Sequence, residues 1–304
     1  MFRSILVPVD GSLMAEQAAM PAAEIAQRLG ARLSLAAVHP WGPMEDAPVS
    51  GTAYDHEVRR QEVRYLERLR DRLADAFDIE VTCRVLEGDP APVLVTFAEE
   101  IGADLAVTST RGRGAFLRTC QGDLALRLAH ALRCPTLFLK PRSRDQVVVR
   151  PTGFQQLLVA LDGSRLAEAS LEPVLALADC SQRHLTLAQV VSPLGSGLAT
   201  RRREALGHLL HLADRLRERD EKVDVRVLAR VDPARALLDL ARHIQADLLA
   251  LVTRERGAAR RIALGSLADA VVHRGAVPAL VCHFPAKPGV ARRAAGARLA
   301  AAVS

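Results

Sequence analysis

The chain has 304 residues, 49% of them hydrophobic, which is enough apolar material for one large or two ordinary domains and argues against wholesale disorder. Its five cysteines include no CxxC pair, and no run of 18 apolar residues occurs, so neither a disulfide framework nor a membrane span is expected. The net charge of +6 is concentrated at one end, because residues 285–304 contain four basic and no acidic side chains. We expect a disordered basic tail over 286–304, not a nucleic-acid surface.

The first apolar run follows Met1 almost at once, without a signal-peptide pattern, so a cytoplasmic location is expected. Apolar runs and amphipathic stretches then alternate along the first half. We predict strands at 4–9, 31–38, 79–86, 104–109 and 135–140. We predict helices at 13–29, 56–77, 90–101 and 122–132.

The second half repeats this order of elements. Residues 155–164 read QQLLVALDGS and match RSILVPVDGS at 3–12, and each is followed by an Ala-rich amphipathic stretch. Strands are predicted at 156–161, 184–191, 223–230, 247–252 and 278–283. Helices are predicted at 166–179, 201–219, 233–244 and 265–274.

Strands that alternate with helices are typical of a doubly wound α/β fold. The repeat therefore predicts two tandem Rossmann-like domains, each a five-stranded parallel sheet with helices on both faces. The boundaries we expect are domain 1 at 1–142, a linker at 143–154, domain 2 at 155–285 and the tail.

Ligands of such sheets bind beyond the carboxyl ends of the strands, where the strand order reverses. Three features are expected to meet there in each half. They are the acid after the first strand (Asp10 or Asp162), the end of the second strand (Val38 or Val191), and the loop after the fourth strand (108–123 or 252–266).

On these motifs, each half resembles a domain of the universal stress protein family. The openings VPVDGS and ALDGS resemble that family's first strand and acid, and the later loops resemble its ATP-binding pattern Gly-x2-Gly-x9-Gly-Ser/Thr. The resemblance implies that ATP, with or without Mg²⁺, is bound by residues drawn from both halves. These are Pro8, Val9, Asp10, Val38, Ser109, Arg111, Gly112, Gly114, Gly122, Asp123, Asp162, Val191, Gly265 and Ser266.

The chain departs from the pattern where phosphate is expected. The pattern falls on Ser109, Gly112, Gly122 and Asp123 in the first half. In the second half it falls on Val252, Glu255, Gly265 and Ser266. Asp123 and Glu255 therefore put one carboxylate near each phosphate position. Two like charges about 4 Å apart repel by about 4 kcal/mol at an effective dielectric near 20, unless neighbouring arginines or a metal ion offset them.

Purely structural roles remain open for the same residues. Asp10 and Asp162 would brace the Asp-Gly-Ser turn, Asp123 would complement a helix dipole, and Gly265-Ser266 would start a helix. No P-loop, no GxSxG elbow, no catalytic base and no convincing metal-ligand set is present.

The resemblance thus implies a tandem stress-response protein that binds an adenine nucleotide (ATP or AMP) and is non-catalytic or weakly ATP-hydrolysing. It also implies that the halves pack as a pseudo-dimer through the last strands, 135–140 and 278–283. The alternative is an interaction or regulatory module that recognises protein partners and whose pockets no longer bind nucleotide. No membrane partner is expected.

Overall fold

The computed structural model describes residues 2–39, 53–109, 124–140, 153–254 and 266–284. Arg111, Gly112, Gly114, Gly122, Asp123 and Gly265 lie outside these ranges. In the first half the strands are β1 (Ser4–Pro8), β2 (Arg32–His39), β3 (Val81–Glu87), β4 (Leu105–Ser109) and β5 (Thr136–Leu139). The helices of this half are α1 (Leu13–Leu29), α2 (Ala53–Phe77), α3 (Pro90–Glu100) and α4 (Leu124–Ala131).

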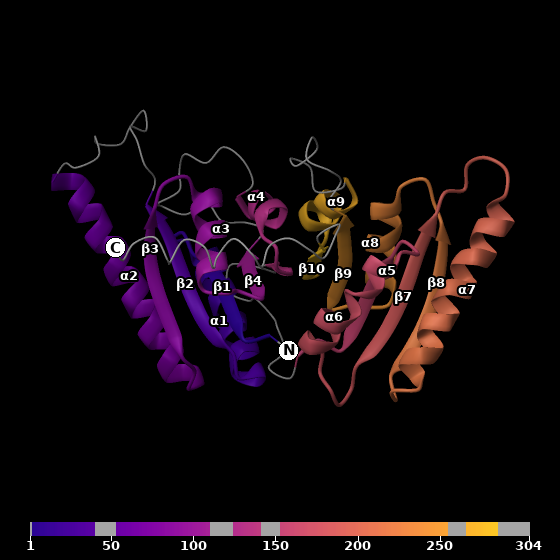
Figure 1. Cartoon of the computed structure of the whole chain (residues 1–304), viewed down its shortest axis with the longest axis horizontal. Helices are drawn as coiled ribbons and strands as arrows, with labels where there is room; N and C mark the ends of the chain where they lie inside the picture. Colours follow the sequence, from indigo (N-terminus) through magenta and orange to yellow (C-terminus); the bar gives the residue numbers. More distant parts are fainter. Residues whose placement is uncertain (1, 40–52, 110–123, 141–152, 255–265, 285–304) are drawn as a thin grey trace, which may run out of the picture.

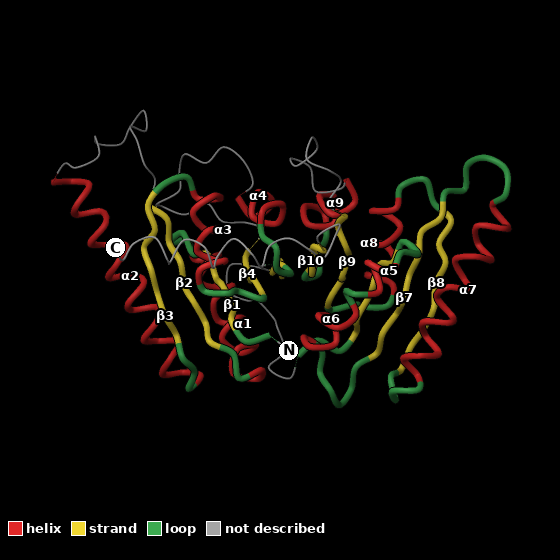
Figure 2. Tube along the Cα trace, viewed as in Figure 1, coloured by secondary structure: helices red, strands yellow, loops and turns green. Residues whose placement is uncertain are grey.

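The second half has the same succession of elements (Figures 1 and 2). Its strands are β6 (Gln156–Leu161), β7 (His184–Val191), β8 (Lys222–Ala229), β9 (Leu248–Arg254) and β10 (Ala279–Phe284). Its helices are α5 (Arg165–Glu168), α6 (Leu171–Leu177), α7 (Leu198–Arg217), α8 (Pro233–His243) and α9 (Ser266–Arg274).

The strands of the described ranges form one sheet with the order β3-β2-β1-β4-β5-β10-β9-β6-β7-β8. Pairing is parallel within each half, which confirms the predicted fold class. The halves meet where β5 and β10 pair antiparallel, with Leu137 directly opposite Leu280. The last strands therefore join the halves, as the family resemblance implied.

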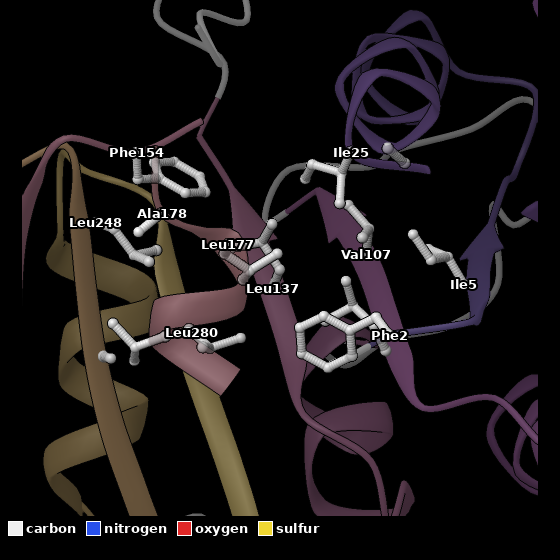
Figure 3. Close-up of a cluster of buried hydrophobic side chains, with 14 of the residues drawn as sticks. Phe2, Ile5, Ile25, Val107, Leu137, Phe154, Leu177, Ala178, Leu248 and Leu280 are labelled. Atoms are coloured by element: carbon white, nitrogen blue, oxygen red, sulfur yellow. The ribbon is translucent and has the colours of Figure 1, made fainter. Parts of the chain in front are cut away.

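Helices cover both faces of the sheet, and the two faces differ. On one face a single apolar cluster runs through both halves, from Leu69 of α2 through Leu137 and Leu280 to Leu209 of α7. Figure 3 shows its central part, where Ile25, Val107 and Leu137 approach Leu177, Leu248 and Leu280. On the other face each half has its own cluster. Phe138 belongs to β5 of the first half, but its side chain packs in the cluster of the second half.

The predicted helix 166–179 is wrong in one respect: it is broken into α5 and α6 at Ser170. The Ser170 hydroxyl donates to the Ala167 carbonyl at 2.7 Å, and Pro173 supplies no N–H to the turn. Pro21 occupies the same position in the first half, yet α1 is continuous there. The residue that matches Ser170 is Ala18, which has no hydroxyl to compete for the backbone. The serine, added to the proline, accounts for the break.

Two of the cysteines are buried: Cys282 lies on β10, and Cys134 lies in the turn before β5. Burial raises the pKa of both Cys134 and Cys282 to about 12. Cys180, by contrast, lies exposed just beyond α6. Within the described ranges, no helix is long and apolar enough to cross a membrane.

Phe138 provides a test of the coupling between halves. Phe138→Ala removes a fully buried ring from the cluster of the opposite half, so the free energy of unfolding should fall by about 3–5 kcal/mol. Urea denaturation followed by circular dichroism measures the change. Leu206→Ala is the control, because Leu206 is exposed on α7 and its loss should cost less than about 0.5 kcal/mol. Similar losses for the two variants would contradict the packing described.

The cysteines give a second prediction. At pH 8 Cys134 and Cys282 remain thiols, so iodoacetamide should alkylate Cys180 at least about tenfold faster, as measured by peptide mass mapping. In the unfolded chain these thiols ionise near pH 9, and in the folded chain near 12. Their contribution to stability is therefore present below pH 9 and is lost as the pH rises toward 12. Equal alkylation rates in the native protein would contradict this burial.

Candidate functional site

The strand order reverses between β1 and β4 in the first half, because β1 pairs with β2 on one side and with β4 on the other. At the carboxyl ends of these strands, Pro8 is the last residue of β1 and Val9 follows it, while Val38 lies on β2 and Ser109 ends β4. Val9 is held to the neighbouring strand by a hydrogen bond from its N–H to the Ala36 carbonyl, at 2.8 Å. These residues of the predicted first-half site therefore lie at the carboxyl edge of the sheet.

Asp10 organises the turn between β1 and α1. Its Oδ1 accepts hydrogen bonds from the Ser12 N–H at 3.0 Å and from the Ser12 hydroxyl at 2.6 Å. The same hydroxyl accepts from the Ala15 N–H at 3.1 Å and so caps α1. Gly11 has a φ of +74°, a conformation that glycine adopts without strain. Asp10 therefore braces the turn, as the structural alternative expected.

The second half repeats this turn in detail. Asp162 Oδ1 accepts from the Ser164 N–H at 3.0 Å and from its hydroxyl at 2.5 Å, and the hydroxyl accepts from the Ala167 N–H at 3.2 Å. Gly163 has a φ of +79°. The two turns therefore present their carboxylates and helix starts in the same way.

After each turn, a glutamate pairs with side chains of the next long helix, α2 or α7. The sequence analysis missed these two glutamate clusters. In the first half Glu16 of α1 forms an ion pair with Arg72 of α2 at 2.8 Å. Tyr65 lies beside them, and its pKa is raised by burial and, to a smaller extent, by Glu16 and Asp10. The phenol is therefore close to the turn and stays protonated.

In the second half Glu168 takes the place of Glu16. It pairs with His208 at 3.2 Å and with Arg215 at 3.6 Å. A signal for these clusters exists in the sequence, because each glutamate stands six residues after the aspartate of its turn. Its partners, however, lie more than 35 residues further along the chain.

The two halves differ most at the end of the second strand. In the first half His39 Nδ1 lies 3.0 Å from Oε2 of the buried Glu62. The strand registers match β2 (Arg32–His39) to β7 (His184–Val191), so the counterpart of His39 is Val191. The sequence analysis had instead grouped Val191 with Val38. The first half thus has a polar pair where the second half has an apolar residue.

Arg111, Gly112, Gly114, Gly122, Asp123 and Gly265 lie outside the described residues, and Ser266 is described only as the first residue of α9. Among the residues that are described, no group of three His, Cys, Asp or Glu side chains could hold a metal ion.

Comparison with known proteins gives consistent matches. The model of the universal stress protein family matches residues 1–140 and 153–283. A universal stress protein of Mycobacterium tuberculosis is 28% identical over 294 residues, which covers 91% of this chain and 96% of that protein.

Two solved structures are similar in fold. A universal stress protein from Archaeoglobus fulgidus has a TM-score of 0.72 at 19% identity, and the match covers 93% of this chain and 97% of that one. A putative universal stress protein from Pseudomonas aeruginosa has a TM-score of 0.62 at 16% identity, with 93% of both chains covered.

The serine caps provide a prediction for this site. Ser12→Ala and Ser164→Ala each remove a hydroxyl that caps a helix, so each should lower the free energy of unfolding by about 1 kcal/mol. Amide hydrogen exchange at Ala15 or Ala167 should accelerate accordingly. Ser12→Thr keeps the hydroxyl and serves as the control. Unchanged exchange at Ala15 in Ser12→Ala would show that the cap is not formed in solution.

Proposed function

This chain belongs to the universal stress protein family as a tandem member, and we propose that it binds an adenine nucleotide, ATP or AMP, without strong catalysis. The observation that carries the proposal is the repeated turn at the reversal point of the strand order. Asp10 and Asp162 fix the entry to a helix at the edge of the sheet where doubly wound folds bind nucleotides. In the first half, the start of the 17-residue helix α1 adds N–H groups and a positive dipole end.

The first half is the better candidate for the nucleotide. Its loop keeps Gly112, Gly114 and Gly122, and glycine lets backbone N–H groups approach phosphate oxygens. Arg111 would offset phosphate charge, and Mg²⁺ would reduce the repulsion from Asp123. The second half keeps Gly265 and Ser266 but has Glu255 where the pattern has its second glycine.

Strong catalysis is not part of the proposal. The Ser12 hydroxyl donates to Asp10 and accepts from the Ala15 N–H, so it serves the turn. A nucleophile instead needs a base that takes its proton and a clear path to the reacting atom. Because both hydrogen bonds hold the hydroxyl in the cap, we assign Ser12 to the turn and not to a reaction.

Isothermal titration calorimetry of the full chain with ATP and Mg²⁺ tests the proposal. We expect saturable heat, and Gly112→Glu should abolish binding at the first site because it adds a carboxylate to the phosphate loop. Gly207→Glu is a matched control: Gly207 lies exposed on α7 with open space around it, so the same change should leave binding intact. Equal losses in both variants would point to a general charge effect.

A second candidate function is supported by Asp123 and Glu255. A module with two degenerate pockets would recognise a protein partner and not a nucleotide. Absence of heat at high protein concentration would reject the nucleotide proposal and favour this alternative. Turnover that disappears in Asp10→Ala would instead indicate an enzyme.

A further inference from the structure

The surface between the halves contains a symmetric part and an asymmetric part. The symmetric part is the strand junction, where Leu137 and Leu280 stand at matching positions of the repeat and lie directly opposite each other. Both side chains are fully buried in the shared apolar cluster (Figure 3). The leucine pair by itself does not distinguish the other half from a second copy of the same half, although Phe138 beside it packs in the cluster of the second half.

The asymmetric part begins with Arg28, in the last turn of α1. Its two terminal nitrogens donate to the carbonyls of Ala178 and Leu177, both at 2.9 Å, at the end of α6 in the opposite half. The guanidinium is half-buried, and burial lowers its pKa while Cys180 and Asp179 act in the opposite direction. Arg28 therefore binds the negative end of a helix that belongs to the other half.

The end of α1 could not return this contact. Gly30, at a φ of +62°, donates its N–H to the carbonyls of Ala26 and Gln27, so the helix caps its own end. α6 has no such glycine: it ends in an extended Ala178, and its terminal carbonyls accept from Arg28. One helix end supplies the cation and the other supplies the acceptors.

A second contact has the same direction. Lys140, which follows β5 of the first half, donates through Nζ to the Val272 carbonyl in the last turn of α9. The last carbonyls of a helix lack partners within the helix, so they favour a cation. Both contacts thus run from a cation of the first half to a helix end of the second half.

We propose that the Arg28 contact makes the pairing surface specific for the unlike half, so that each half recognises the other half and rejects a second copy of itself, while the Lys140 contact strengthens the junction without selecting the partner. If two first halves met, Arg28 would face another Arg28 in the place of Cys180 and Gln27 in the place of Asp179. If two second halves met, the ends of α6 would face no arginine. The leucine pair and Lys140 hold the two halves together, and Arg28 determines which half is accepted as the partner.

Hydrogen–deuterium exchange of the full chain tests this proposal. In Arg28→Met/Lys140→Met, amides of β5 and β10 should exchange about 10- to 100-fold faster, since each lost bond involves a charged donor. Amides of the β1–β2 and β6–β7 pairs provide the internal control and should stay unchanged. Unchanged exchange at the junction would overturn the proposal, as would an equal acceleration in all strands.

A charge swap tests the asymmetry itself. Cys180→Arg puts a second guanidinium beside Arg28 and should accelerate exchange at the junction, whereas the neutral control Cys180→Gln should not. Arg28→Met/Cys180→Arg moves the cation to the second half, where it meets the self-capped end of α1. We expect no recovery of protection in this swap. Full recovery would mean that one cation on either side is enough, and would overturn the proposal.

Discussion

The antiparallel pairing of β5 with β10 determines how the rest of the molecule is arranged. A parallel sheet that stops at β5 would expose a row of unpaired N–H and C=O groups, and such edges invite other strands. Here each half covers that edge with the other half. The outer edges are β3 and β8, and they carry charged side chains such as Arg84 and Arg226 that disfavour strand addition. The pairing of β5 with β10 thus leaves β3 and β8 as the outer edges of the sheet, and both carry charged side chains.

The same arrangement leaves the carboxyl edges of the two halves free to diverge. Each Asp-Gly-Ser turn is fixed by its own hydrogen bonds and by a glutamate cluster behind it, so neither depends on the junction. The turns have kept one geometry, while the ends of β2 and β7 have become polar in one half and apolar in the other. The two carboxyl edges therefore share the geometry of their turns but differ in the chemistry at the end of the second strand.

The sequence was sufficient for the fold because its strongest signals are local. Continuous apolar runs before each Asp-Gly-Ser turn predicted β1 and β6. Because the two halves repeat the same order of elements, each element predicted in one half supported the matching prediction in the other. The break at Ser170 could not be foreseen in this way, since it depends on a single hydroxyl that competes for a backbone carbonyl. Local propensity at 166–179 favours one continuous helix.

Within the candidate site, only contacts between residues close together in the sequence could be predicted. The brace from Asp10 to Ser12 spans two residues and was anticipated as an alternative. The pairs Glu16–Arg72 and His39–Glu62 join residues far apart in the chain, and nothing in their spacing indicates contact. Arg28 is harder still, because its partners are backbone carbonyls about half the chain away, which no side-chain pattern reveals.

The glutamate clusters also record the order in which the protein acquired its features. Glu16 with Arg72 and Glu168 with Arg215 occupy matching places in both halves, so the simplest history puts them in the single-domain ancestor, before its gene was duplicated. The His39–Glu62 pair exists in one half only, which dates the difference at that position to a time after duplication. The difference between the carboxyl edges is therefore younger than the frame that the two halves share.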